Sequence, residues 1–396
     1  MRRSTIGLLA VALAGMAASR SLAADPPRGP WIGYTEFRTD LPGGRHANVA
    51  TMRATLIRRD GTERRILVPE LAREPGSWTQ FAGWSPDGQT AIVGRGWESA
   101  DNARWEEEHR TFRYVESGWL YDMNLVDPDR GTATNLTAID RVSFHNTGLF
   151  FWPGDPKRLG FQALIDGNSH PFVMDRDGRN KRDLTLGSKE FAYGFNASPD
   201  GRRIAYHQGY QLVLADADGS QARRVETGRP FNFAPQWSPD GSLVLFLSGE
   251  HYDCHPYLVQ ADGSGLRKLA DRGGYRGVIE FLDVPDFHGG SSDIPVWSPD
   301  GAWVFFTSQV GKQVELFRIR REGGTPERLT SSKEGVRHYH PVPSPDGRFV
   351  AFGSLDQGVR QLDLMELAHR TTSRLTGLTR GHGAMWPHWQ PTAMHD

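Results

Sequence analysis

Trp84-Ser85-Pro86-Asp87-Gly88 is the stretch of sequence that decides the fold, because it recurs along the chain. Its copies, the last two without the tryptophan, lie at 237–241, 297–301, 198–201 and 344–347. In such a turn proline presets φ, aspartate accepts hydrogen bonds from backbone N–H groups, and glycine takes a positive φ. A run rich in strand-forming residues follows each copy, for example Trp303-Val-Phe-Phe306. The sequence therefore predicts a tight turn between two strands at each copy.

The spacing of these turns predicts how many strands each repeat holds. A second turn, such as Asp218-Gly219, follows a third strand, and a short last strand ends in Leu-Thr or a similar pair, such as Leu184-Thr185. Four strands per repeat, at intervals of roughly 40–60 residues, are typical of a β-propeller.

The two ends of the chain complete this count. Six repeats begin near residues 80, 144, 193, 233, 294 and 340, and the second has Trp152-Pro-Gly-Asp155 as a degenerate turn. Residues 31–74 supply three strands, and Met385–Trp389 supplies a lone first strand. We therefore predict an all-β fold, a seven-bladed β-propeller of four-stranded blades. N- and C-terminal strands would close it in one blade and leave no free sheet edge.

Composition and the N-terminal residues limit the partners and the location that we expect for the chain. The 396 residues include one cysteine and carry a net charge of −1, so we expect neither a disulfide framework nor a nucleic acid partner. Arg2, Arg3 and the apolar run 6–18 predict a signal peptide over residues 1–24. Residues 25–396 would form a single exported propeller domain, periplasmic or extracellular and monomeric. No later run is long and apolar enough to predict a membrane span.

The Trp-Ser-Pro-Asp-Gly repeats resemble the TolB-type propeller repeat over nearly the whole chain after residue 24. This resemblance is specific for the fold and leaves the function open. TolB proteins are periplasmic binding scaffolds, whereas the same repeat also builds polysaccharide lyases, including oligogalacturonate lyases and ulvan lyases. It also builds the non-catalytic half of prolyl oligopeptidases, but the sequence has no Gly-x-Ser-x-Gly motif for such a hydrolase.

Histidines gather at one end of the predicted blades. The connection between second and third strands and the entry into the first strand lie opposite the Ser-Pro-Asp-Gly turns, and we place eleven of the fourteen histidines there. Imidazole binds metals and exchanges protons near neutral pH, so this end is expected to hold a chemical site. The alternative is that the connections at this end are longer and hold more residues of every kind.

Two clusters predict a divalent transition metal, zinc or manganese. His338 and His340 alternate along a predicted strand, so both imidazoles would point to the same side. Cys254 and His255, with His288 later in the same region, form a nitrogen and sulfur set suited to zinc. The alternatives are a small buried thiol and histidines with structural or solvent-facing roles.

The site residues also resemble those of the propeller lyases. The His-x-His-Pro segment is similar to the metal-binding segment of oligogalacturonate lyases, although Gly335 stands where those enzymes have glutamine. Ulvan-lyase-like propellers are similar in carrying a His/Cys zinc site. A further set, His145, His170, Tyr210 and Arg229, follows the catalytic order of ulvan lyases at similar spacing, which implies a catalytic role. Ordinary loop residues are the alternative interpretation.

The sequence thus supports two functions. One is a lyase that cleaves a uronic-acid-containing polysaccharide by β-elimination, in which Arg229 or a bound metal neutralises the carboxylate. His145 or His170 would take the C5 proton, and Tyr210 or the other histidine would protonate the departing O4. The other function is that of a TolB-like binding propeller, which holds a peptide or a glycan without turnover.

Overall fold

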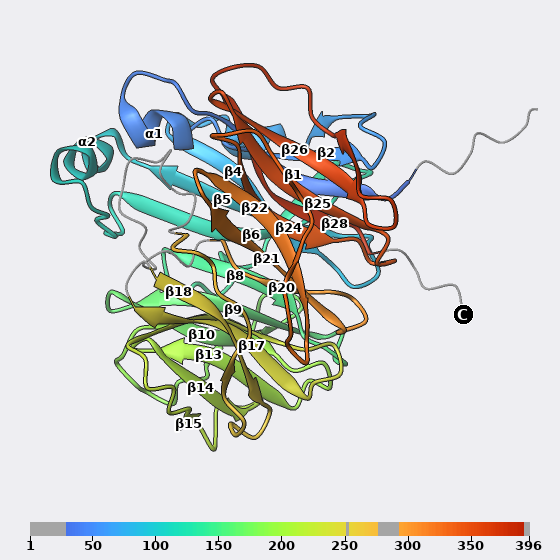
Figure 1. Ribbon diagram of the computed structural model, residues 1–396. Coiled ribbons are helices and arrows are strands. Elements are labelled where there is room, and N and C mark those ends of the chain that lie inside the picture. The colour runs from blue at the N-terminus through green and yellow to red at the C-terminus, as the bar shows by residue number, and fades with distance from the viewer. Residues whose placement is uncertain (1–28, 251–252, 276–292, 392–396) are drawn as a thin grey trace, which may run out of the picture.

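The regular structure of the chain is almost entirely β-strand (Figure 1). The structure is a computed structural model that describes residues 29–250, 253–275 and 293–391. The predicted signal peptide, residues 1–24, lies outside the described residues, as does His288.

Antiparallel pairing arranges the strands in groups of four. Three groups are β4 (Ser77–Trp84), β5 (Ala91–Glu98), β6 (Trp119–Asp127), β7 (Thr132–Asn135); β8 (Asn146–Phe151), β9 (Arg158–Ile165), β10 (Asn168–Asp175), β11 (Arg182–Asp183); and β12 (Ala192–Ala197), β13 (Arg203–Gln208), β14 (Gln211–Asp216), β15 (Arg223–Arg224). Three more are β16 (Phe231–Trp237), β17 (Leu243–Glu250), β18 (Asp253–Gln260), β19 (Arg267–Lys268); β20 (Val296–Trp297), β21 (Trp303–Val310), β22 (Gln313–Arg320), β23 (Glu327–Arg328); and β24 (Arg337–Pro343), β25 (Phe349–Asp356), β26 (Val359–Glu366), β27 (Thr371–Arg374). The predicted four-stranded repeat is confirmed.

The remaining group joins the two ends of the chain. It consists of β28 (His382–Trp389), β1 (Trp31–Arg38), β2 (Arg53–Arg58) and β3 (Arg65–Ile66). Strand β28 runs antiparallel to β1, with Trp389 opposite Ile32 and His382 opposite Arg38. The predicted pairing of the C-terminal strand with residues 31–38 is therefore present, although the strand begins earlier than Met385. Single parallel residue pairs also link β22 to β24 and β26 to β28.

Each Ser-Pro-Asp-Gly copy forms the same hydrogen-bonded turn. In the copy at 237–241, Ser238 Oγ donates to Asp240 Oδ1 at 2.6 Å and accepts from the Leu243 N–H at 2.9 Å. The Gly241 N–H donates to the Ser238 carbonyl, and Gly241 has a φ of 69°. The other four copies repeat the serine–aspartate bond and the glycine conformation. The predicted turn is confirmed at all five positions.

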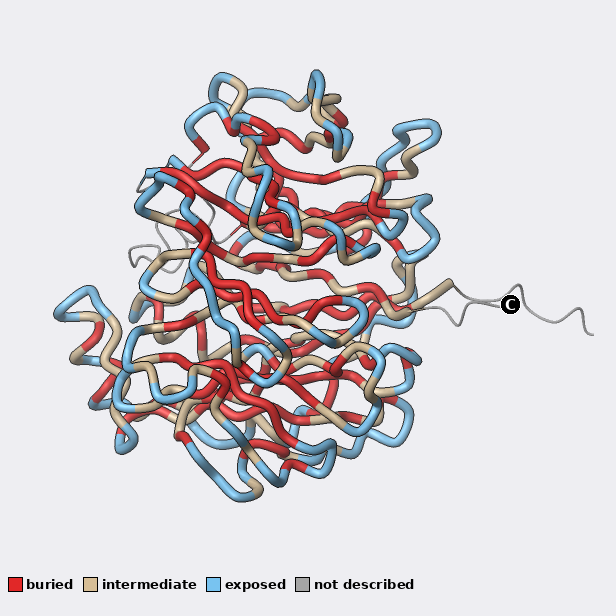
Figure 2. Tube along the Cα trace, turned by 90° about the horizontal axis from the view of Figure 1, so that it is seen from below, coloured by how far each residue is buried: buried red, intermediate tan, exposed pale blue. Residues whose placement is uncertain are grey.

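Large apolar side chains form the core between neighbouring groups. Figure 2 shows buried segments along the strands and exposed segments at the connections. Between two groups, Leu212 and Leu214 of β14 pack with Trp237 of β16 and Phe246 of β17. Full burial of each such side chain contributes about 1.5–3 kcal/mol. The guanidinium of Arg203 covers the outer side of the same cluster, 4.9 Å from the Trp237 ring centroid.

Short helices are inserted into two connections between second and third strands. Helices α1 (Gly44–Val49) and α2 (Ala100–His109) lie side by side (Figure 1), and η1 (Pro69–Ala72) follows β3. Arg45 of α1 forms an ion pair with Glu106 of α2, and His46 Nδ1 lies 2.7 Å from Glu98 Oε2. Among the described residues, no helix has the length and apolar character needed to span a membrane.

Candidate functional site

Tyr210 and Arg229 are brought together by an asparagine that the sequence analysis did not identify. Gly209 and Tyr210 form the two-residue turn between β13 and β14, both with positive φ, as such hairpin turns require. The Asn232 side chain donates to the Tyr210 carbonyl at 2.9 Å and to the Arg229 carbonyl at 3.2 Å. This buried amide therefore fixes the two backbone segments that carry the predicted acid and the predicted cation.

The Tyr210 ring lies on an aromatic cluster. It stacks on His207, with ring centroids 6.0 Å apart and planes 8° apart, and it meets the edges of Phe231 and Phe233. The ring is half-buried, and burial raises the pKa of its hydroxyl. A neutral phenol at neutral pH is the form that can donate a proton.

The Arg229 side chain remains accessible at this site. It is 47% exposed, and its Nη1 lies 3.9 Å from Oε1 of Glu250, which is itself 63% exposed. A pair this open and this long contributes little to stability. The Arg229 guanidinium is therefore available to a carboxylate from outside.

His145 lies in a separate cage of aromatic rings. Its ring centroid is 5.0 Å from that of Tyr114, 5.9 Å from Trp119 and 5.5 Å from Tyr121. Burial lowers the pKa of His145 to about 4, and the charge of Asp122 opposes this shift. Among the described residues, no hydrogen-bond partner contacts the buried Nδ1 of His145. His145 is thus an uncharged imidazole at neutral pH.

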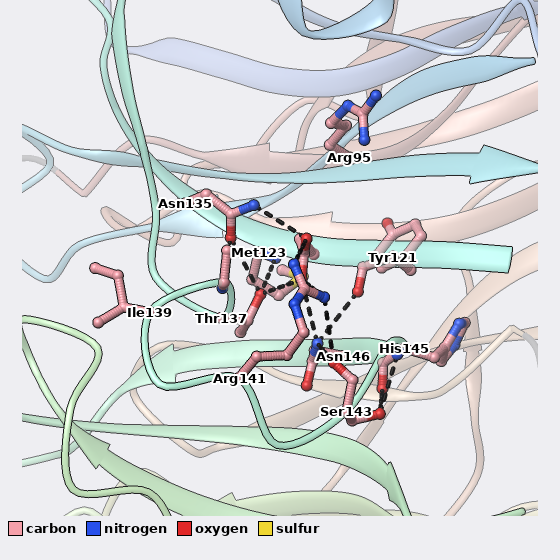
Figure 3. A network of polar contacts seen from close by, with 12 residues as sticks. Arg95, Tyr121, Met123, Asn135, Thr137, Ile139, Arg141, Ser143, His145 and Asn146 are labelled. Carbon is pink, nitrogen blue, oxygen red and sulfur yellow. Dashed lines mark hydrogen bonds and ion pairs between the residues drawn. The ribbon is translucent and has the colours of Figure 1, made fainter. Parts of the chain in front are cut away.

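A polar network beside the cage holds the His145 backbone in place (Figure 3). The buried carboxylate of Asp122 accepts from Thr137 Oγ1 at 2.9 Å and from Arg141 Nη2 at 2.9 Å. Ser143 Oγ accepts from the His145 N–H at 3.0 Å, and the His145 ring points away from this network. The network therefore positions His145 without using its imidazole.

Tyr193 connects the His145 cage with the Tyr210 cluster. Its phenol interacts electrostatically with that of Tyr121, and its ring centroid lies 6.0 Å from that of His207. The link between the two clusters therefore runs through Tyr121 of β6, Tyr193 of β12 and His207 of β13.

His170 does not belong to this arrangement, since it fastens two strands of its own group. It lies in β10 instead of a loop, 6% exposed, with Nδ1 2.8 Å from Asp183 Oδ2 and 3.3 Å from Thr185 Oγ1. A side-chain contact between a third-strand polar residue and the threonine fifteen residues later recurs in three other groups. The pairs are Asp122 with Thr137, Glu315 with Thr330, and Gln361 with Thr376. His170 therefore occupies a structural position of the repeat.

His255 occupies, in the group of β16 to β19, the third-strand position that His170 occupies in its own group. The surroundings of the His255 side chain there differ from those of Cys254. The Leu269 N–H donates to the carbonyl after His255, as the Leu184 N–H does to the carbonyl after His170. His255 Nδ1 accepts from the Arg272 N–H at 3.2 Å, whereas Cys254 packs against apolar residues including Phe233. Consecutive side chains of a strand point to opposite faces, so the structure does not bring Cys254 and His255 together.

His338 and His340 also contact different surroundings. His338 Nε2 lies 2.8 Å from Ser332 Oγ and 3.8 Å from Glu315 Oε2, while the His340 ring stacks on Trp386 at 5.8 Å. The expectation that both rings share one side of a regular strand is wrong. A register shift follows Tyr339, and His340 has a φ of 48°, which interrupts the alternation of side chains.

Three of the eleven histidines lie in strands instead of connections, although they adjoin the connections at the same end. The strand boundaries predicted from sequence put His170, His207 and His255 in connections between second and third strands, but the three lie within β10, β13 and β18 respectively. The connections are two-residue turns in two of these groups, so the adjoining positions remain in strands. Over the described ranges, no three His, Cys, Asp or Glu side chains converge in a way that could hold a metal ion.

Comparison with known proteins identifies the repeat. A family model described as the TolB beta propeller domain matches residues 167–395. An uncharacterized protein of Agrobacterium fabrum is 29% identical over 209 residues, which are 49% of this chain and 64% of that protein. The tricorn protease of Thermoplasma acidophilum is 23% identical over 231 residues, 50% of this chain and 21% of the protease. The chain thus spans less than two thirds of the length of either relative.

Solved structures agree on the fold. TolB from Acinetobacter baumannii matches with a TM-score of 0.50 and 15% identity, over 92% of this chain and 67% of that chain. An oligogalacturonate lyase in complex with manganese matches with a TM-score of 0.55 and 15% identity, over 88% of this chain and 85% of the lyase. A prolyl endopeptidase matches with a TM-score of 0.57 and 10% identity, over 88% of this chain and 48% of the peptidase. At these identities the likeness concerns the fold alone.

Proposed function

The chain belongs to the TolB β-propeller family, and from this premise we propose that it is a polysaccharide lyase. It would cleave a uronic-acid-containing polysaccharide by β-elimination. The observation that carries this proposal is the junction at Asn232, whose amide binds the backbone carbonyls of Arg229 and Tyr210. The Arg229 guanidinium is accessible and the Tyr210 phenol is half-buried. His145, an uncharged imidazole, is linked to the Tyr210 cluster through Tyr121 and Tyr193.

We propose that the groups of four strands form a closed seven-bladed ring and a single domain over residues 25–396. The pairing of β28 with β1 supports closure, because it joins strands from the two ends of the chain in one group. The family and the apolar run at 6–18 support export to the periplasm or the extracellular space, after removal of residues 1–24. We expect the domain to be a monomer.

In the proposed reaction each residue has a separate task. Arg229 binds the uronate carboxylate and stabilises the negative charge that develops beside it when C5 loses its proton. The uncharged His145 accepts that proton through a ring nitrogen. The electron pair of the C5–H bond forms the C4–C5 double bond, the bond from C4 to O4 breaks, and Tyr210 gives its proton to O4.

A zinc or manganese ion remains a prediction outside this mechanism. The proposed ligands were Cys254, His255 and His288 in one set and His338 and His340 in the other. The described members do not fit one ion, because Cys254 and His255 point to opposite faces and the other pair contacts different residues. The structure of an oligogalacturonate lyase of the same fold contains manganese. A metal analysis of the purified protein therefore tests the predicted ion.

A TolB-like binding function is the second candidate, and one observation favours it. His170 and His255 serve the repeat structure, so part of the histidine concentration needs no chemistry to explain it. A binding propeller would use the accessible Arg229 and the aromatic rings to hold an acidic glycan without turnover.

Incubation with polygalacturonate, alginate and a glucuronate-containing polysaccharide separates the two functions. Only elimination creates an unsaturated uronate, which absorbs in the ultraviolet. We expect Tyr210→Phe to lower kcat by about 10²-fold or more while binding persists, because a proton donor is lost. We expect Arg229→Ala to weaken both binding and turnover, by roughly 2–4 kcal/mol.

Matched variants control for nonspecific damage in this experiment. Tyr257→Phe removes the hydroxyl of a buried tyrosine in β18, and Arg202→Ala removes an exposed arginine at the opposite end of a sheet. Both should keep wild-type activity. Absence of unsaturated product from every polymer, with binding intact, would favour the binding function instead.

A further inference from the structure

Two adjoining cavities lie away from the Tyr210 site, at the end of β25, β26 and β28. One has a volume of about 660 Å³ and is lined by Asp356, Gln357, Val359, Gln361, Arg374 and Arg380. The other has a volume of about 400 Å³, and its lining includes Asp40, Leu355, Gln357, Arg360 and Arg380. Their volumes fall in the range of about 300–1,000 Å³ of small-molecule sites. Gln357 and Arg380 line both.

Within the described part of the chain, the Gln357 amide and the Arg380 guanidinium have no protein partner, whereas the remaining charged side chains of these cavities do. Among the described residues, neither the Gln357 amide nor the Arg380 guanidinium makes a hydrogen bond or an ion pair. The lining acids are already paired, Asp40 with Arg38 at 2.7 Å and Asp356 with Lys333 at 2.8 Å. Arg374 is paired with Asp363. Both side chains are exposed, so the cavities present one amide and one cation that a ligand can reach.

The backbone that carries Arg380 is held on both sides. On one side Gln361 Nε2 donates to the Leu378 carbonyl at 2.6 Å. On the other side the Gly381 carbonyl accepts from the Thr39 N–H and from Arg38 Nε, both at 3.0 Å. A fixed backbone under an unpaired side chain lowers the entropy cost of binding a ligand there.

Gln357 lies in a position that its residue type does not favour. It has a φ of 49° in the two-residue turn before Gly358, where glycine, asparagine or aspartate is usual. Glycine at 357 would fit the turn at least as well, so the glutamine side chain is not needed to form it. This separates the amide's contribution to a ligand from any contribution to folding.

We propose that these cavities form a binding site for a carboxylate-bearing saccharide unit, with Arg380 on the carboxylate and Gln357 on a hydroxyl. Arginine matches a carboxylate with two parallel hydrogen bonds, and an amide suits a sugar hydroxyl. The lining side chains are mostly polar, with Val359 and Leu355 as the apolar members. The site requires no turnover, although the choice of a uronate as the ligand rests on the proposed function.

Calorimetric titration with a trimer of galacturonic acid tests this site in an Arg229→Ala background, which removes the cation of the other site. We expect Arg380→Gln to weaken binding at least about tenfold, because a charge-assisted pair is lost. Gln357→Gly should weaken it by a few-fold with unchanged thermal stability. Arg202→Gln, an exposed arginine at the opposite end of a sheet, should leave the affinity unchanged.

A neutral galactose trimer is the ligand control and should bind at least tenfold more weakly. Equal affinities in Arg380→Gln and Arg202→Gln, equal affinities for the two trimers, or no binding of the acidic trimer would each overturn the proposal. Failure of the lyase proposal would give a different result. The chain would form no unsaturated product, while Arg380→Gln would still lower the affinity for the acidic trimer.

Discussion

The two ends of the strand groups follow opposite rules. At the end formed by the Ser-Pro-Asp-Gly turns, five copies repeat the same serine–aspartate bond and the same glycine conformation. At the other end the described connections differ from one another. Some are two-residue turns, such as Gly209-Tyr210 and Gln357-Gly358, while others contain α1 or α2.

This difference indicates which parts of a repeated fold can vary in function. The uniform end fixes the strand pairing, so changes there cost stability without altering any site. The variable end carries the Tyr210–Arg229 junction and the cavities at Arg380, and each is formed by residues of two neighbouring groups. Loops supported by a rigid scaffold commonly carry binding residues. The experiments that follow test this division.

Removal of the C-terminal strand should have the largest effect. Truncation after Arg380 deletes β28, which pairs with β1 along nearly its whole length. The edge of β1 would be left unpaired and apolar residues such as Met385 would be lost from the core. We expect insoluble or unfolded protein by circular dichroism and gel filtration. A soluble truncated chain with cooperative thermal unfolding would refute closure by the terminal strand.

The recurring polar contact between third and fourth strands should come next in effect. Asp122→Ala leaves Arg141, Thr137 and Asn135 without their buried acceptor, and we expect a loss of about 3 kcal/mol. His170→Gln removes one bond to Asp183, which is partly exposed, and should cost about 1 kcal/mol.

Activity and denaturant unfolding together decide the role of His170. If it only fastens strands, His170→Gln keeps the wild-type kcat wherever the protein is folded. A loss of kcat of about 10²-fold in fully folded His170→Gln would instead make it a catalytic residue.

Two glycines of the uniform end separate backbone conformation from packing. Gly201 and Gly347 have φ values of 69° and 66°. A Cβ at Gly201 would lie 2.3 Å from the Pro153 carbonyl oxygen, whereas one at Gly347 meets no atom within 4 Å. We expect Gly347→Ala to cost about 1 kcal/mol, and Gly201→Ala to cost about 1–3 kcal/mol more because of the clash. Equal midpoints in urea would show that the turns do not pack as described.

The uniform end could be predicted from sequence because its information is local. Ser238, Asp240 and Gly241 make their bonds within one turn, so the motif alone determines the structure. The pairing of the C-terminal strand β28 with β1 could be predicted by counting the strands in each repeat. The degenerate turn at 152–155 was also recognised, since Trp152 still occupies its place in the core.

The site was harder to predict because it depends on contacts between groups. The rings of His207 in β13 and Phe233 in β16 meet across two groups, and nothing in the local sequence shows this. The break in alternation at His340 depends on one backbone angle. The structural role of His170 did leave a signal, because a polar residue stands fifteen positions before the threonine of each Leu-Thr pair that ends a repeat.

The smallest expected effect is a difference in how the two ends respond to acid. At the variable end, burial lowers the pKa of His145 to about 4 from an ordinary 6.5. The unfolded chain therefore binds this proton more readily, and stability falls as the pH drops from about 6.5 towards 4. At the uniform end, the serine hydroxyls lower the pKa of Asp87, Asp200 and Asp300 below 3.8. Their contribution is lost only when the pH falls below about 4.

Urea unfolding of wild type and His145→Gln between pH 7.5 and pH 5.5 isolates the histidine. Over this interval the titration of His145 should lower the free energy of unfolding of the wild type by about 1 kcal/mol. The variant has no titrating group at this position, so its decrease should be about 1 kcal/mol smaller. Ser298→Ala, which removes the hydroxyl that bonds Asp300, is the matched control. It should lower stability equally at both pH values, because Asp300 is ionised throughout. Parallel curves for wild type and His145→Gln would show that the imidazole is solvated, and the cage would then not hold an uncharged base.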